Sequence, residues 1–360
     1  METRLMRGRE SLVRWLEQLE ALAEACLWRQ PFFRRAWVES WLETAGSGLM
    51  PVALGIEEDG RLCGFWPFFE YRTILGRGLW PMVGEFADFF DPLYDGRPEV
   101  LGALAAGLEN SLGRRGYAFA WVPCLSARFF EQCHRWPLDT PHPQRLIRRR
   151  ERNPILRIEG SFADWEARHT SPRSRKNMRR QQRMLAARGT VAFEHWEHPD
   201  DLRSLLRLCA SIERQSWKGE RGRGLWSSPR FRHFYQKLLP RLAEEGRLRL
   251  DTLSVDGHYI GYQIGLREPN WYGLHSIAYL PEYAKMSPGK LLLRHFIEQC
   301  HNAGEFATLD FLQGAFDYKL RFASEVIDLH DLSLFAPTLR GRLVRWLMGH
   351  KRPPSDQSLP

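Results

Sequence analysis

A stretch of strand, turn and helix signals between Leu248 and Phe322 constrains the fold of this chain more than any other segment. Asp256-Gly257 stands between two apolar runs, and this dipeptide is typical of the tight turn that joins antiparallel strands. Aromatic and β-branched residues in the next run predict a third strand, and an apolar helical period follows it. The expected elements are strands at 248–255, 259–266 and 271–279, a helix carrying Leu291, Leu292, Leu293, Phe296 and Ile297, and a short strand at 308–312.

The junction between the third strand and the helix is a candidate binding site. It reads Ser287-Pro288-Gly289-Lys290. Pro288 suits the first turn of a helix, Gly289 permits close approach to the backbone, and Lys290 adds a cation to the unpaired N–H groups there. Such a helix start can hold a phosphate or pyrophosphate. The alternative, which this tetrapeptide alone favours, is an ordinary helix start capped by the Ser287 side chain.

A comparable pattern of strand, turn and strand occurs in the first half of the chain. Residues 52–69 read VALGIEEDGRLCGFWPFF, with Asp59-Gly60 at the turn. The two patterns lie much farther apart than the period of a solenoid, so they predict two copies of one α/β domain in a chain of 360 residues. The proline-flanked basic stretch 141–154 is the expected boundary. The expected parts are therefore domains at 1–150 and 151–338 and a basic tail at 339–360.

The charge balance and the cysteines limit the partners and the compartment. A net charge of +9 and a pI near 9.4 favour an anionic partner, namely a phosphate-rich cofactor, a nucleic acid or a membrane surface. The alternative is arginine on solvated faces. The six cysteines form no CxxC pair, which is typical of free thiols in a reducing cytosol. Because no signal-peptide region or membrane-spanning apolar run is present, we expect a soluble, cytoplasmic protein.

Metal and nucleophile motifs are absent from the sequence. We find no HExxH, no GxSxG and no Walker A pattern. We therefore expect no metal site and no tightly bound cofactor.

A second basic stretch, residues 171–189, predicts a helix with seven cations and no acid. These cations are Arg173, Arg175, Lys176, Arg179, Arg180, Arg183 and Arg188. Met178 and Leu185 mark a thin apolar edge. Such a helix can bind RNA or phosphates, although no aromatic residue is interleaved to stack bases. The alternative, of equal weight, is a helix whose charges are neutralised by acids elsewhere in the fold.

Two loop segments are further candidates. Asp88, Asp91 and Asp95 lie among aromatic residues, where carboxyl pKa values can rise so that the groups act as bases. They are equally good turn formers. The segment 219–224, GERGRG, is expected to be a mobile loop over a site.

The tail predicts a basic amphipathic helix over residues 339–351. Its apolar residues are Leu339, Leu343, Val344, Trp346 and Leu347, and its basic residues are Arg340, Arg342, Arg345 and Lys351. One interpretation is that this helix lies on an anionic membrane surface, which makes the protein peripheral to the inner membrane. The other is that it packs on the domain.

Several motifs occur in an order that resembles a known family. They are RxRKNxRR at 173–180, ERQSWK at 213–218, the second Asp-Gly hairpin, the SPG helix start and DFxxGxxxYKxxF at 310–322. This set looks like the GNAT-type acyltransferases of the CelD group, associated with cellulose and exopolysaccharide biosynthesis. The two-domain plan is similar to that of the Fem-type peptidyltransferases. The resemblance covers most of the chain and is clearest over residues 150–325.

The resemblance implies a fold and an activity. The fold is α/β (α+β), with tandem GNAT-like domains that are each a mixed, mostly antiparallel sheet flanked by helices. The activity is N-acyl transfer from acyl-CoA, as a co-substrate, to an amine acceptor in polysaccharide or cell-envelope biosynthesis. In GNAT enzymes the acyl-CoA pyrophosphate lies at a helix start that matches Ser287, Pro288, Gly289 and Lys290. The segment LPEYAKMSPGK differs from the usual RxxGxG/A loop because it has only one glycine.

The same resemblance suggests roles for individual groups. The backbone groups expected to bind the donor and the oxyanion are those of His275, Ser276, Ile277 and Ala278. The Lys319 ammonium is expected to face the cleft between the domains and to stabilise the oxyanion. Glu213 or Asp310 is expected to accept the amine proton, and Tyr318 to protonate the departing thiolate. The structural alternatives are a core aromatic for Tyr318, a buried cap for Asp310 and a surface ion pair for Lys319.

Two other functions remain open at this point. Gly314, Tyr318 and Lys319 match a Gly-x-x-x-aromatic-Lys segment of Fem-type enzymes, which take aminoacyl-tRNA, so the basic helix 173–188 would contact tRNA. The helical arm that these enzymes often carry is missing from the sequence. The third function is a non-catalytic interaction module, which bulky side chains beside Gly289 would favour.

Overall fold

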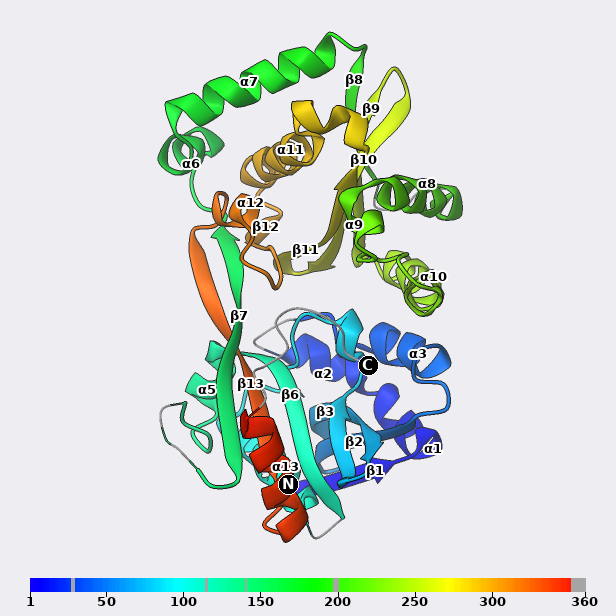
Figure 1. Cartoon of the computed structure of the whole chain (residues 1–360), viewed down its shortest axis with the longest axis vertical. Coiled ribbons are helices and arrows are strands. Elements are labelled where there is room, and N and C mark those ends of the chain that lie inside the picture. The colour runs from blue at the N-terminus through cyan, green and yellow to red at the C-terminus, as the bar shows by residue number, and fades with distance from the viewer. Residues whose placement is uncertain (27–29, 114–115, 139, 141, 197–200, 351–360) are drawn as a thin grey trace. The chain divides into compact units, whose positions relative to one another are not determined.

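The computed structural model describes residues 1–26, 30–113, 116–138, 140, 142–196 and 201–350, and the chain divides into two compact units (Figure 1). Unit 1 consists of Met1–Arg152 and the chain from Ile327 onward, and unit 2 is Asn153–Val326. Strands β7 (Arg145–Arg157) and β13 (Glu325–Phe335) carry the chain from one unit to the other.

The sheet of unit 1 has the strand order β1-β2-β3-β4-β6-β13, with β5 paired to β3. The strands are β1 Glu2–Arg7, β2 Met50–Glu58, β3 Arg61–Thr73, β4 Gly76–Pro81, β5 Leu93–Tyr94 and β6 Tyr117–Ser126, followed by β13. Only β4 and β6 pair in parallel, and the other described pairs are antiparallel. The helices are α1 Arg9–Leu16, α2 Leu19–Ala25, α3 Arg35–Glu43, the 3-10 helix η1 Gly84–Phe86, α4 Pro98–Ser111, α5 Ala127–Gln132 and α13 Leu339–His350. Buried indoles of Trp15, Trp37, Trp41, Trp66 and Trp136 fill the core between these layers.

The sheet of unit 2 has the strand order β7-β12-β11-β10-β9-β8. The strands after β7 are β8 Val191–Trp196, β9 Leu248–Val255, β10 His258–Glu268, β11 Asn270–Tyr279 and β12 Phe306–Asp310. Only β11 and β12 are parallel among the described pairs. The helices are α6 Phe162–His169, α7 Pro172–Ala186, α8 Leu202–Gln215, α9 Trp217–Glu220, α10 Pro229–Glu244, the 3-10 helix η2 Pro281–Met286, α11 Pro288–Ala303 and α12 Asp317–Leu320. Each unit is thus a mixed, mostly antiparallel sheet flanked by helices, which confirms the predicted fold class.

Both predicted Asp-Gly turns are two-residue hairpin connections. Asp59 and Gly60 have φ values of 50° and 78° and join β2 to β3. Asp256 and Gly257 have φ values of 48° and 77° and join β9 to β10. Positive φ at both central positions is the type I′ geometry, whose twist matches that of paired strands. The local sequence therefore sets the register of both hairpins.

The faces of the unit 2 sheet are covered by different helices (Figure 1). Tyr272 of β11 contacts Phe296 of α11, with ring centroids 4.2 Å apart, and both belong to one buried cluster. On the opposite face, Tyr262 of β10 bonds Glu213 of α8. The sheet is therefore buried on both faces, as the apolar runs of β9 to β11 predict.

The end of the second domain differs from the prediction of 151–338. From Ile327 onward the chain belongs to unit 1, because β13 pairs antiparallel with β6 from Leu329 to Phe335. The tail from residue 339 also belongs to unit 1, where Val344 of α13 packs against Phe119 and Phe335. The predicted helix therefore packs on its domain, and the tail after His350 lies outside the described residues. No described helix is long and apolar enough to cross a membrane.

Candidate functional site

Strand β11 continues beyond its parallel neighbour β12. Their pairing begins at Asn270 and ends where Gly273 faces Asp310, whereas β11 runs on to Tyr279 and stays paired with β10 to its end. No strand in the described part of the chain extends β12 along residues 274–279. One edge of this segment is thus open to an extended ligand that pairs with the backbone.

A β-bulge in β11 turns two consecutive side chains to one face. In the β10–β11 register Gly265 pairs with Leu274 and Ile264 with Ser276, so His275 is the extra residue. Leu274 packs in the core with α11, whereas His275 and Ser276 both bond side chains of the α8–α10 layer. Bulges commonly re-aim side chains next to functional sites.

Glu213, Tyr262, Ser276 and Lys218 form a hydrogen-bonded cluster on this face. Tyr262 Oη donates to Glu213 Oε2 at 2.7 Å and lies 3.1 Å from Ser276 Oγ. Lys218 Nζ donates to Ser276 Oγ at 2.8 Å. Burial, followed by the charge of Glu213, raises the pKa of Tyr262 well above its usual range, so the phenol keeps its proton. The cluster links a half-buried ammonium to a fully buried carboxylate.

The segment after α9 closes over the Glu213 carboxylate. The backbone N–H of Trp226 donates to Glu213 Oε1 at 2.9 Å. Gly224 has a φ of 143°, and a Cβ added there would lie 2.4 Å from the Glu213 carboxyl carbon. The predicted loop at 219–224 thus ends against a candidate catalytic group, while its mobility stays a prediction.

His275 is a neutral group beside this cluster. Its Nε2 lies 3.0 Å from Tyr235 Oη. Burial, with a smaller contribution from the charge of Lys218, lowers the pKa of His275 to about 3. The imidazole is therefore uncharged at neutral pH and adds no cation to the site.

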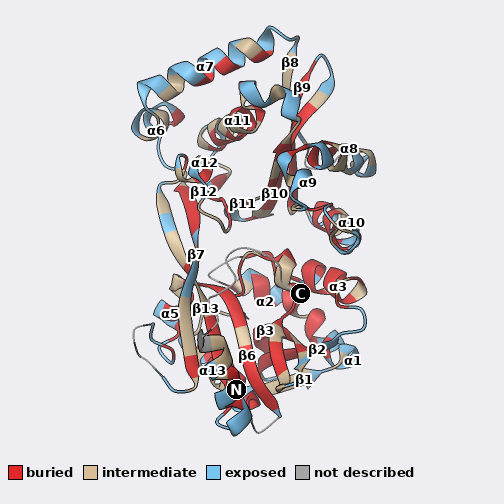
Figure 2. Ribbon diagram, in the orientation of Figure 1, coloured by how far each residue is buried: buried red, intermediate tan, exposed pale blue. Residues whose placement is uncertain are grey.

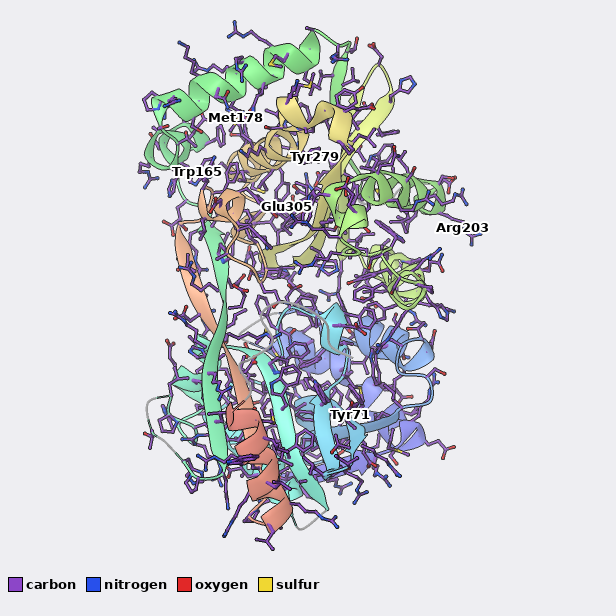
Figure 3. All side chains as sticks on the ribbon, in the orientation of Figure 1. Tyr71, Trp165, Met178, Arg203, Tyr279 and Glu305 are labelled. Atoms are coloured by element: carbon purple, nitrogen blue, oxygen red, sulfur yellow. The ribbon has the colours of Figure 1, made fainter. Side chains whose placement is uncertain are left out.

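Ser287 is the N-cap residue of α11, as the tetrapeptide alone favoured, but its side chain makes no cap hydrogen bond. Ser287 lies in the left-handed region with φ 53°, and its Oγ accepts a hydrogen bond from Gln181 Nε2 at 2.8 Å instead. Pro288 occupies the first turn, as predicted. A Cβ added at Gly289 would lie 3.3 Å from the ring of Tyr279 (labelled in Figure 3). The glycine therefore allows close packing of α11 against β11.

A cavity of about 290 Å³ lies beside the start of α11. Its lining residues are His169, Thr170, Ser171, Ser174, Asn177, Met178, Gln181, Lys290, Arg321 and Phe322. Burial and the nearby charge of Arg321 lower the pKa of Lys290. The lining holds two cations and no carboxylate, and it includes Ser171, which caps the N-terminus of α7. This composition suits a phosphate or another small anion.

Helix α7 presents its cations to solvent. Met178 and Leu185 are buried, as predicted, and most of the helix is exposed (Figure 2). Within the described chain, no acidic side chain lies within ion-pair distance of the exposed cations Arg173, Lys176, Arg179, Arg180 and Arg183. Among the residues that the structure describes, the alternative of a helix neutralised by acids elsewhere is therefore not found.

Asp310, Tyr318 and Lys319 lie in and after β12. Asp310 is buried and accepts a hydrogen bond from the backbone N–H of Leu312 at 2.7 Å, which is the predicted cap. Burial raises the pKa of Tyr318 to about 12. Lys319 is 7% exposed, and its Nζ donates to the carbonyl of Gln313 at 2.7 Å and to that of Leu312 at 3.4 Å. Lys319 is thus a buried cation that holds the loop after β12, rather than a surface residue.

The structure brings some of the predicted site residues together. Glu213, Ser276 and His275 lie on the α8–α10 face of the sheet, and Ser287 to Lys290 lie beside the open edge of β11. The groups that sequence reasoning missed are Lys218, Tyr262, Gln181 and Arg321. Lys218 ends the ERQSWK motif and Arg321 lies within the last motif, so both carried a signal, whereas Tyr262 resembles any aromatic residue of a buried strand.

Comparison with known proteins places the matched family in unit 2. Residues 172–320 match the family described as acetyltransferase (GNAT) domain. No curated protein matches the chain. In the part of the chain that the structure describes, no group of three or more His, Cys, Asp or Glu residues forms a metal-ligand set.

Two solved structures are similar to the whole chain in fold. FemX has a TM-score of 0.62 at 10% identity, with 97% of this chain and 100% of that chain covered. A conserved protein of unknown function from Bacteroides thetaiotaomicron has a TM-score of 0.58 at 10% identity, with 89% and 97% covered. At such identity the likeness shows the fold alone.

Proposed function

We propose that this chain is an N-acyltransferase whose site lies in unit 2 and whose donor is an acyl-CoA. The observation that carries the proposal is the open edge of β11 beside the start of α11 and the cationic cavity. The amides of a pantetheine arm suit backbone pairing along residues 274–279. The phosphates suit Lys290 and Arg321, which are the cations of the cavity. The GNAT match over residues 172–320 supports the same reaction class.

The proposed chemistry is direct attack of an amine on the thioester. The amine nitrogen forms a bond to the acyl carbon, the C–S bond breaks, and the sulfur leaves as a thiolate that Tyr318 is proposed to protonate. Backbone N–H groups of 275–278 are proposed to stabilise the oxyanion. The amine proton passes to Ser276 Oγ as the Ser276 proton moves to Glu213, 3.4 Å away.

Lys319 enters this proposal as a positioning residue. Its ammonium bonds two carbonyls of the loop after β12, so it fixes the end of the strand from which β11 diverges. Asp310 acts in the same way through the backbone of Leu312. Membership of the CelD group is part of the proposal, supported by the order of the motifs from 173 to 322.

The proposal is tested by thermal shift with CoA and with pantetheine, which lacks the phosphates. CoA should raise the melting temperature by several degrees, since a ligand that binds only the folded state stabilises it. Lys290→Gln should weaken CoA about tenfold in Kd, the effect of losing one charge-assisted contact, and should leave pantetheine unchanged. Lys285→Gln is the matched control, because Lys285 is exposed in η2 and outside the cavity lining. No shift with CoA would refute acyl-CoA as the donor.

The second candidate is an aminoacyl-tRNA-dependent transferase of Fem type. The observation in its favour is the exposed face of α7, whose cations have no acidic partner within the described chain. In the same assay, this function predicts a shift with bulk tRNA that is lost steeply as salt rises. The double change Arg179→Gln and Arg183→Gln should then remove the thermal shift with tRNA and leave the thermal shift with CoA unchanged.

The third candidate is a non-catalytic module. It is favoured by the Tyr279 ring and the Ile277 side chain, which would lie 3.3 Å and 3.6 Å from a Cβ added at Gly289 and so occupy the space beside that glycine. A melting temperature that neither CoA nor tRNA changes would support this candidate over the two transferases.

A further inference from the structure

Helix α13 is held in a fixed orientation on unit 1. A Cβ added at Gly341 would lie 2.1 Å from the carbonyl oxygen of Ala336, so the first turn packs tightly on the preceding backbone. Val344 is 4% exposed in a cluster with residues of β6 and β13. Arg345 donates to the carbonyl of Pro143, and Arg148 donates to that of Met348 at 3.5 Å. The outward side of the helix is therefore defined.

The side of α13 that faces away from unit 1 carries a row of exposed apolar side chains. Leu339 is 83% exposed, Leu343 is 46% exposed and Trp346 is 59% exposed. Positions i, i+4 and i+7 form one stripe of a helix, and this stripe lies opposite the side that carries Gly341 and Val344. Three large apolar side chains in one exposed row are more than the scattered apolar residues of an ordinary surface.

A further exposed apolar residue belongs to a hairpin that packs on the same core as this helix. Ile74, at the turn between β3 and β4, is fully exposed at 103%. Its neighbour Leu75 packs on the same cluster as Val344 and Met348. The hairpin tip and α13 are therefore anchored on one core. We name the exposed side chains of Ile74, Leu339, Leu343 and Trp346 the apolar patch.

Arginines flank the apolar patch. Arg340 and Arg342 are exposed on either side of the stripe, and α13 contains no acidic residue. Within the described chain, neither arginine has an acidic side chain within ion-pair distance. Arg72, beside the hairpin tip, is ion-paired with Glu70, with Arg72 Nε 3.2 Å from Glu70 Oε1, so it adds no uncompensated charge. The surface of α13 thus combines exposed apolar side chains with the uncompensated charges of Arg340 and Arg342.

We propose that the apolar patch and its flanking arginines bind the surface of an anionic lipid bilayer. Leucine, isoleucine and tryptophan insert into the boundary between headgroups and acyl chains, where indole rings are favoured. The arginines lie at the depth of the phosphates, because their long side chains reach outward while their methylene groups stay among apolar atoms. The helix lies in the plane of the surface, and its other side stays packed on unit 1.

Charge argues against a second copy of the chain as the occupant. A two-fold contact through α13 places the same surface on both sides. Arg340 and Arg342 would then face their own copies without an acid on the helix to offset the repulsion. An anionic bilayer supplies the opposite charge on a broad surface, so it fits both features of the patch.

Flotation of the full chain with vesicles tests the proposal. Vesicles of equal parts phosphatidylcholine and phosphatidylglycerol should carry the protein upward at low salt, and vesicles of phosphatidylcholine alone should not. Arg340→Gln with Arg342→Gln should weaken binding by about fivefold for each arginine removed. Leu339→Ser with Leu343→Ser should reduce it by a larger factor, since both leucines lose their contact with the acyl region.

Matched variants on α1 control for loss of charge or apolar surface in general. Arg9 is exposed there and Val13 is 50% exposed, so Arg9→Gln and Val13→Ser should float as the unchanged protein does. Because the leucines and arginines that are replaced are exposed, melting temperatures should stay the same. The proposal is overturned by equal flotation with both vesicle types, by no flotation at low salt, or by dimerisation through the leucines without vesicle binding.

Discussion

At the scale of single residues, Asp91 shows how burial changes a carboxyl group. Its Oδ1 accepts a hydrogen bond from the backbone N–H of Ser126 at 2.9 Å. Burial outweighs that bond and raises the pKa of Asp91 to about 6. The sequence predicted a raised pKa among the aromatic residues of 84–96. The structure adds the role of Asp91, which is to bond the start of α5 rather than to project as a free base.

Asp91→Asn should change the dependence of stability on pH. The folded state keeps the Asp91 proton up to about pH 6, whereas the unfolded state releases it near pH 4. Between these values the folded state binds more protons, so the free energy of unfolding falls as pH rises through this window and is level above it. The asparagine should remove this fall and add about 1–3 kcal/mol at pH 7.

Denaturant titrations at a series of pH values measure this effect. Asp59→Asn is the control, because Asp59 is an exposed residue in a turn where asparagine tolerates a positive φ. A fall of equal size in Asp91→Asn and in the unchanged protein would show that Asp91 is not the group responsible.

At the scale of elements, the sequence correctly predicted the turns and strands that depend on neighbouring residues. It did not predict the directions in which the side chains of His275 and Lys319 point. The Asp-Gly dipeptides gave both hairpins, and β9 has the predicted bounds. The bulge at His275 was missed because β11, NWYGLHSIAY, has no strict alternation of apolar and polar residues that one extra residue would visibly break. Lys319 was assigned to the cleft or the surface, because a lysine beside Asp317 gives no sign that α12 turns it inward against carbonyls.

Lys319→Met should destabilise unit 2. The change removes the donor for the Gln313 and Leu312 carbonyls in a buried loop. Leaving buried polar groups without that donor costs about 1–3 kcal/mol. The melting temperature should therefore fall, contrary to the expectation for a surface or purely catalytic lysine. Thermal denaturation checks this, with Lys285→Met as an exposed control; an unchanged melting temperature would rule out the structural role.

At the scale of the whole molecule, the sequence predicted the first boundary between the units, near Arg152. It did not predict that the chain re-enters unit 1 at Ile327. The basic stretch at 141–154 is a compositional signal, and the first division falls there. The second division depends on the pairing of β13 with β6, for example Leu329 with Ser126. The sequence of a strand does not show which distant strand it pairs with. The pairing of β13 with β6 therefore could not be predicted from either segment.

Deleting the chain after Val326 should unfold unit 1 and spare unit 2. Strand β6 would lose its antiparallel partner from Leu329 to Phe335, and the cluster around Phe119 would lose Val344. Exchange of backbone amide hydrogens measures the result within one sample, because local protection follows local stability. Amides of β6 should lose protection, while those of β9 and β10 keep it as the internal control. The division of the domains at 338 predicts the reverse, so protected β6 amides with exposed β9 amides would reject the units described here.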